Sequence, residues 1–169
     1  MPAGSTYTPI ATTTISGSST TQVTFSSISG YTDLVCVANT APLANIAVLQ
    51  VRFNNDSGDN YSYVQYSGNG SSSATTTDTA QNYALASGTL LDTTNRTMHI
   101  MYVNDYANAT TYKTLLTRGN RAANTSLAAV SESASIWLNT AAITSYTIRA
   151  GGEILPAGST FTLYGLLGA

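Results

Sequence analysis

The sequence predicts an all-β fold, an antiparallel β-sandwich of the jelly-roll type, and three observations support this. Charged residues make up only 8% of the chain, against roughly 25% in ordinary soluble domains, and runs of Ser, Thr, Asn and Gly supply the polar surface instead. Helical periodicity is weak, whereas short runs with period-two alternation recur between turn signals. The 169 residues are enough for one domain with its own core. We therefore expect about 8–10 strands in a single domain covering residues 9–169.

Strands are expected wherever β-branched and aromatic residues alternate between two turn signals. The run 45–53 shows the pattern, because successive side chains of a strand point to opposite sides. One face carries Ala47, Leu49, Val51 and Phe53. We expect this face to pack into the core. The predicted strands are 7–15, 20–28, 31–39, 45–53, 60–66, 97–103, 111–118, 130–138, 143–149 and 160–167.

The run 97–103 has apolar residues on both of its faces. One face carries Met98, Ile100 and Tyr102, and the other carries His99, Met101 and Val103. A strand of this kind is typical of the middle of a sheet that has something packed on each side, and we expect that placement here. The segment 112–130 has the length of a helix, but Gly119 and the polar residues after it interrupt the pattern. Strand, loop and strand are expected there.

The chain carries nearly the same seven residues near its two ends, PAGSTYT at 2–8 and PAGSTFT at 156–162. Pro and Gly are typical of a turn, and the Ser-Thr-aromatic-Thr that follows is typical of the start of a strand. The residues beyond do not align, so the match indicates turn chemistry used twice and not a repeat. We expect the first and last strands to be neighbours, which would close the sheet on itself and protect an edge.

Charge and composition exclude several classes of partner. Six Lys and Arg residues are scattered along a chain of net charge −2, so no basic stripe exists to neutralise phosphates, and nucleic acid is not an expected partner. No window approaches the roughly 18 apolar residues of a membrane span, and the N-terminus lacks the pattern of a signal peptide. The single cysteine, Cys36, lies in an apolar strand, where we expect a small buried hydrophobe.

The residues that carry most catalytic chemistry are few. The one histidine, His99, lies in the middle of a predicted strand with no acid nearby in the sequence, so we expect a structural histidine with satisfied hydrogen bonds and not a general base. One histidine and one cysteine exclude three-histidine and paired-cysteine zinc sites. Two of the eight acids could still meet across a cleft, as in a glycosidase. We expect no enzyme activity, no metal and no cofactor.

The polar loop at 53–63 has two interpretations. Its Asn and Asp residues around Gly58 offer the oxygen ligands that calcium takes. The spacing is not that of an EF-hand, and the segment joins two predicted strands, so Asx side chains that cap a tight connection are favoured over an ion. Tyr61, Tyr63 and Tyr66 follow the loop. They are either surface-contact aromatics for sugars or proteins, or the amphipathic rim of a strand.

Three segments carry a more specific pattern. They are Phe53-Asn54 with Gly58 and Asn60-Tyr61-Ser62, then Trp137 with 139–143, and finally Gly158-Ser159, Phe161 and Leu163-Tyr164-Gly165. This pattern resembles a family of small structural proteins of tailed-phage virions, the capsid cement or decoration proteins, and the likeness covers nearly the whole chain. The resemblance implies a jelly roll, usually oligomeric, that decorates the capsid or forms the head of a fibre. It implies no catalytic residues.

The resemblance leaves two functions open. The first is a capsid decoration protein, a homotrimer that binds the major capsid protein on the outer surface of the virion and stabilises the joints between capsomers. The lack of a shaft segment favours this function. The alternative is a receptor- or carbohydrate-binding module of a tail or head fibre, with the three tyrosines and Trp137 as stacking platforms.

An N-terminal arm at residues 1–8 is a candidate for the contact with the capsid. An unanchored terminus is free to pair with the edge of a neighbouring sheet. The predicted arm consists of Met1, Pro2, Ala3, Gly4, Ser5, Thr6, Tyr7 and Thr8.

Overall fold

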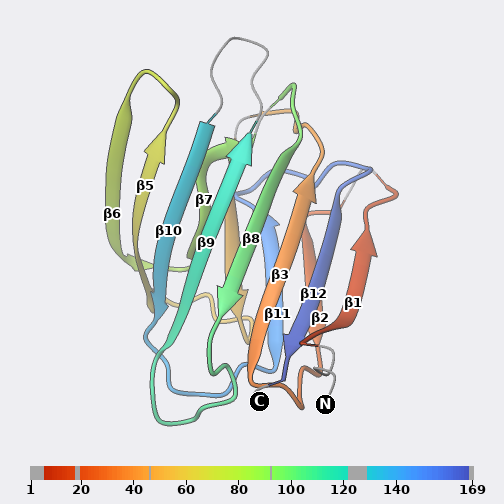
Figure 1. The fold of residues 1–169 in the computed structure, drawn as a ribbon, viewed down its shortest axis with the longest axis vertical. Coiled ribbons are helices and arrows are strands. Elements are labelled where there is room, and N and C mark those ends of the chain that lie inside the picture. Colours follow the sequence, from red (N-terminus) through yellow and green to blue (C-terminus); the bar gives the residue numbers. More distant parts are fainter. Residues whose placement is uncertain (1–5, 18–19, 46, 92, 122–128, 168–169) are drawn as a thin grey trace.

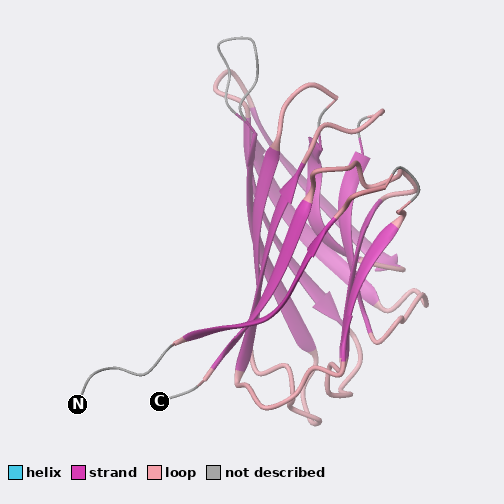
Figure 2. Ribbon diagram, turned by 90° about the vertical axis from the view of Figure 1, so that its right-hand side faces the viewer, coloured by secondary structure: helices cyan, strands magenta, loops and turns pink. Residues whose placement is uncertain are grey.

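The computed structural model describes residues 6–17, 20–45, 47–91, 93–121 and 129–167. These residues form two antiparallel sheets, of eight and four strands, which confirms the predicted all-β sandwich. Figure 1 looks onto the larger sheet, and Figure 2 shows the molecule from the side. Among the described residues, no helix has the length and apolar character needed to cross a membrane.

The strands of the two sheets come from alternating parts of the chain. The larger sheet has the order β1 (Tyr7–Thr14), β12 (Thr160–Leu166), β3 (Asp33–Thr40), β8 (Thr97–Val103), β9 (Lys113–Arg121), β10 (Ala129–Trp137), β5 (Tyr61–Gly68) and β6 (Ser73–Gln81). The smaller sheet has the order β2 (Gln22–Ser26), β11 (Ser145–Ala150), β4 (Ala47–Phe53) and β7 (Ala84–Leu91). Each strand predicted from the sequence is present, within a few residues of its expected bounds.

The core lies between the two sheets and is centred on aromatic rings. β4 confirms its predicted face, because the residues Ala47, Leu49, Val51 and Phe53 are all buried. The ring centroid of Phe53 lies 5.6 Å from that of Trp137 on β10 and 5.5 Å from that of Tyr146 on β11. Cys36 is buried as predicted, and burial raises the pKa of its thiol. The rings of Phe53, Trp137 and Tyr146 bury a large apolar area and hold the two layers together.

Two strands, β6 and β7, were not predicted from the sequence. β6 reads SATTTDTAQ and is exposed along almost its whole length, so neither of its faces carries the apolar alternation that marks a strand. It is an edge strand that pairs with β5, and this pairing defines it. β7 reads ALASGTLL, and its central Ser and Gly break the pattern in the same way.

The two terminal strands are neighbours, as predicted, because β1 pairs with β12 along the edge of the larger sheet. The expectation that this pairing closes the sheet is wrong, since β1 and β6 form two open edges at opposite sides. Tyr7 and Thr8 already belong to β1 and pair with Leu166 and Gly165. Those two residues are therefore not part of a free arm, and residues 1–5 of the predicted arm lie outside the described residues.

Strand β8 lies in the middle of its sheet, between β3 and β9, as predicted. The expectation that both of its faces are covered is wrong. Met98 and Tyr102 remain 43% and 36% exposed, because the smaller sheet packs on the opposite face alone. The segment 112–130 contains the whole of β9 and the first two residues of β10, so a helix is excluded there for the described residues.

Gly165 in β12 has no room for a side chain, because the ring of Tyr31 lies where a Cβ atom would project. Gly165→Ala should displace the ring of Tyr31, which packs against the core, and we expect the free energy of unfolding to fall by about 2 kcal/mol. Chemical denaturation followed by circular dichroism measures this effect. Gly17→Ala is the control, since a Cβ at Gly17 would meet nothing within 4 Å. Equal denaturation midpoints for the two variants would contradict the prediction.

Candidate interaction surface

The larger sheet turns one face toward the core and the other away from the smaller sheet, and we call the second one the outer face. The strand register arranges its side chains in rows across the sheet. The apolar row contains Tyr164, Val35, Tyr102, Leu116, Ala134 and Val64, one residue each from β12, β3, β8, β9, β10 and β5. Each member is aliphatic or aromatic, so this row forms a continuous apolar band across the middle of the sheet.

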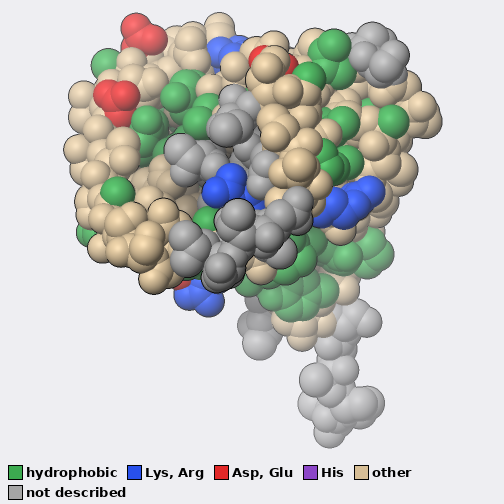
Figure 3. All heavy atoms as spheres, turned by 90° about the horizontal axis from the view of Figure 1, so that it is seen from above, with side chains coloured by type: hydrophobic (Ala, Val, Ile, Leu, Met, Phe, Trp, Pro, Cys, Tyr) green, Lys and Arg blue, Asp and Glu red, His purple; other side chains and the backbone are tan. Residues whose placement is uncertain are grey.

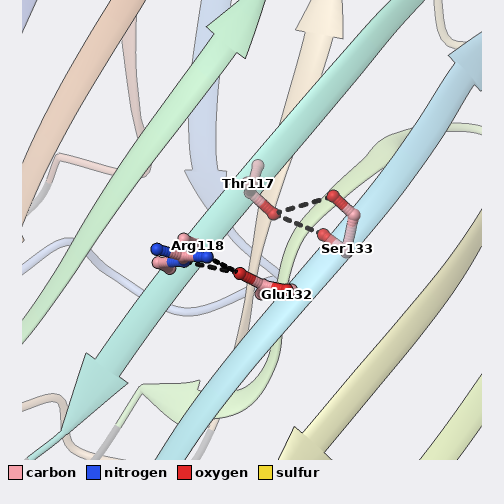
Figure 4. Close-up of polar contacts among 4 residues, drawn as sticks. All are labelled: Thr117, Arg118, Glu132 and Ser133. Carbon is pink, nitrogen blue, oxygen red and sulfur yellow. Dashed lines mark hydrogen bonds and ion pairs between the residues drawn. The ribbon is translucent and has the colours of Figure 1, made fainter.

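The neighbouring row combines apolar and polar side chains. It contains Thr162, Val37, Ile100, Arg118, Glu132 and Tyr66 in the same strand order. Arg118 and Glu132 are the charged members of the two rows, and they form an ion pair between β9 and β10 (Figure 4). Thr117 lies next to Arg118 in β9, and Ser133 lies next to Glu132 in β10. Both are buried, and they are hydrogen-bonded to each other. The sheet therefore changes from solvent-facing to core-facing with each residue along β9 and β10.

Large apolar side chains on the outer face are exposed to solvent. Leu116 is 55% exposed and Tyr66 60%. In the row beyond Ile100, Met98 and Val130 lie on either side of Asn120, and both are exposed as well. A contiguous apolar patch of this kind is typical of a surface that contacts another protein.

Tyr7 extends the outer face to the edge of the sheet. It pairs with Leu166, and its ring meets that of Tyr164 edge-on at a centroid distance of 6.1 Å. Seen from above, the molecule shows isolated acidic and basic groups among uncharged side chains (Figure 3). Tyr7 of the predicted arm therefore joins the same apolar face.

The 53–63 loop is held by its own side chains. Asp56 accepts hydrogen bonds from the backbone N–H of Gly58 at 2.9 Å and from Asn60 Nδ2 at 2.9 Å. It also accepts one from Trp137 Nε1 at 2.7 Å. Burial raises the pKa of Asp56, but these hydrogen bonds outweigh burial, and the pKa lies below its ordinary value. The predicted Asx cap is confirmed. Within the described part of the chain, no three His, Cys, Asp or Glu side chains gather where they could hold a metal ion.

The three tyrosines after the loop lie in different environments. Tyr61 is 0% exposed and its hydroxyl accepts a hydrogen bond from the Phe53 N–H at 3.1 Å, so the prediction of Tyr61 as a surface-contact aromatic is wrong. Tyr63 is partly buried and stacks on Tyr83. Burial and the nearby Tyr83 hydroxyl raise the pKa of Tyr63 to about 12. Of the three, Tyr66 alone lies on the outer face, because it is an odd number of residues from the other two.

His99 lies on the core-facing side of β8 and is 0% exposed. Neither ring nitrogen has a hydrogen-bond partner among the described residues. The expectation that the hydrogen bonds of this histidine are satisfied is therefore wrong. Its cross-strand neighbours, Ala38 and Gly119, have no polar side-chain atoms to offer. Burial lowers the pKa of His99 to about 4, so the ring is neutral at neutral pH.

The sequence interpretation missed the outer face as a surface. It named Tyr66 but not Leu116, Val130 or Val64, which complete the face. The sequence of β8 carried a signal for this surface, because both faces of that strand are partly apolar. An apolar residue on both sides of a strand indicates either a second packed layer or an exposed contact face, and only the position of the smaller sheet decides between them.

No family model matches the chain, and neither a curated protein nor a solved structure matches it. The class of protein is therefore described by its fold and its surface. The protein is an all-β sandwich, and the outer face of its larger sheet exposes large apolar side chains. Such a surface is suited to contacts between proteins.

Proposed function

We propose that this protein is a structural protein that acts through surface contacts, and specifically a capsid decoration protein on the outer surface of a tailed-phage virion. The observation that carries the proposal is the outer face, where an apolar row crosses the sheet and Tyr66, Tyr102 and Leu116 are exposed. Uncovered apolar faces of this extent mark contact sites between proteins. The resemblance of the sequence to virion proteins supplies the particular setting, with the major capsid protein as the partner.

The strand order supports a jelly roll, the finer fold that the resemblance implies. β1, β12, β3 and β8 are neighbours in the larger sheet, β2, β11, β4 and β7 form the smaller sheet, and the chain alternates between these two groups. The hairpin of β5 and β6 and the pair β9 and β10 extend the larger sheet at one side. A double sheet of this kind, built from two Greek keys, is common in viral capsid proteins.

A decoration protein of this kind stabilises a capsid by adding many weak contacts. Each copy spans a joint between capsid subunits, and a homotrimer multiplies the contacts of one copy into a persistent attachment. With charged residues at 8% of the chain, the contacts depend on shape and apolar area more than on long-range electrostatic steering.

The number of copies in purified virions tests the proposed function. We expect the protein in a simple ratio to the major capsid protein, because a decoration protein follows the symmetry of the capsid lattice. Stained-gel densitometry of purified particles measures the ratio, with a tail protein of the same particles as the low-copy reference. A copy number equal to that of the tail protein would contradict decoration and favour a fibre, and absence from the particle would contradict a virion role.

The fibre alternative, a receptor- or carbohydrate-binding module, keeps one exposed residue among the four stacking platforms suggested by the sequence. Tyr61 and Trp137 are buried in the core, so of the suggested stacking platforms Tyr66 is the one with an open ring face. A single ring supplies little of the stacking area that sugar binding needs. A glycan array probed with the assembled protein would detect this activity, and Tyr66→Ala should then abolish the signal.

A further inference from the structure

Leu116, Tyr66 and Val130 leave much of the outer face exposed to solvent, and we propose that this face is the surface through which copies of this protein bind one another. This inference rests on the proposed function, that of an oligomeric structural protein. It assigns the outer face to contacts between copies, so that the assembled oligomer meets the capsid through its other surfaces.

The size of the outer face fits a stable contact between two copies. The apolar row, its neighbour and the row of Met98 and Val130 each cross the six strands from β12 to β5. Six strands about 4.8 Å apart, over six residues that each rise about 3.4 Å, give roughly 600 Å² of sheet. A standard interface buries about 800 Å² on each partner, so the face supplies most of the area that a contact between two copies needs.

The composition of the face resembles the centre of an interface. Its exposed members are two tyrosines, a methionine, a leucine and a valine: Tyr66, Tyr102, Met98, Leu116 and Val130. Aromatic residues and methionine are enriched at the centres of protein interfaces, whereas charged residues are depleted there. A shallow hollow lined by Ile100, Tyr102 and Leu116 offers a place for a side chain from the opposite copy.

The charges of the face favour a second copy over a partner with a net charge. Arg118 and Glu132 lie side by side and are 72% and 48% exposed, so the face has one group of each sign and no net charge in its two central rows. In a contact between two copies, Arg118 of one can pair with Glu132 of the other, so both charges keep a partner.

The proposal predicts the effect of a charge placed on the apolar row. Leu116→Glu puts a carboxylate at the centre of the face, so association of the copies requires that this charge lose its water. We expect the dissociation constant to rise on the order of 100-fold or more. Sedimentation velocity of the purified full chain, over a wide range of concentrations, measures the mass against the 17.6 kDa of one copy. Raised ionic strength should leave the association of the original chain unchanged or stronger, because apolar contact is not screened by salt.

Ile154→Glu is the matched control. Ile154 is 46% exposed against 55% for Leu116, and it lies in the connection between β11 and β12, away from the apolar row. This variant should associate like the original chain. Leu116→Gln is a second test without a charge and should weaken association to a smaller extent. Circular dichroism of each variant establishes that the fold is kept.

Two results would overturn the proposal. The first is an original chain that sediments as a single copy at every concentration, which would assign the face to a different occupant. The second is association of both Leu116 variants at the strength of the original chain, which would assign the contact to another surface, such as the open edges β1 and β6. Neither result bears on the copy number in virions. A failure of the proposed contact between copies can therefore be distinguished from a failure of the proposed function.

Discussion

Replacing Trp137 with alanine should lower the free energy of unfolding by about 4 kcal/mol, the range observed when a large buried aromatic is truncated. Trp137 is 1% exposed, and its ring stacks on that of Tyr61 at a centroid distance of 6.3 Å. Its ring centroid also lies 5.6 Å from that of Phe53 on the opposite sheet. The substitution leaves a cavity between the two layers. It also removes the indole N–H that donates a hydrogen bond to Asp56.

Urea denaturation followed by tyrosine fluorescence and circular dichroism measures this loss. Trp137→Phe separates the two contributions, because it keeps most of the packing and removes the hydrogen bond to Asp56. We expect this variant to lose about 1.5 kcal/mol. Leu138→Ala is the neighbouring control, since Leu138 is 44% exposed, and it should change stability by less than about 1 kcal/mol. A loss for Trp137→Ala as small as that of the control would contradict the role of this ring as the centre of the core.

Acid should destabilise the protein through His99. The pKa of this buried histidine is lowered from 6.5 to about 4 in the fold, because burial disfavours the charged ring. Between these two values the unfolded chain binds a proton that the folded chain does not. The free energy of unfolding therefore falls as the pH falls through this window, by about 3 kcal/mol in total, and the contribution is fully present above it.

His99→Leu should remove this part of the pH dependence. The variant has no titrating ring, and it also removes two nitrogens that have no hydrogen-bond partner among the described residues, so its stability at neutral pH should equal or exceed that of the original chain. Denaturation curves at a series of pH values, for both proteins, isolate the contribution of His99 from that of the carboxylates. The protein has one histidine, so a nuclear magnetic resonance titration reads it directly. A midpoint near 6.5 would contradict the prediction.

Alternation was enough to predict the strands that have one apolar face, and it failed where that face is missing. β4 and β10 alternate between buried and less buried residues along most of their length. β6 has no buried residue in this pattern, because an edge strand that extends beyond the smaller sheet needs no apolar side. Its Thr-rich sequence is a strand because β5 offers it unpaired backbone groups.

The tyrosines show the same limit at the level of single residues. Spacing separates Tyr66 from Tyr61 and Tyr63, since residues an odd number apart point to opposite faces of a strand. Spacing does not say which of the two faces is the core. The loop at 53–63 turns Tyr61 inward, where its hydroxyl accepts a hydrogen bond from the backbone of Phe53, and this contact joins residues that the sequence places on two different strands.

The sequence by itself determined the all-β class, the antiparallel sandwich, the capped loop around Asp56 and the residues that share a face on most strands. These features depend on local turn chemistry and on period-two alternation, which short stretches of chain carry in full. Only the tertiary structure decided which faces are covered. The smaller sheet has four strands and the larger eight, and the smaller sheet packs against one face of the larger sheet. The apolar row around Leu116 is therefore exposed because a sandwich of two layers leaves an outer face on each sheet.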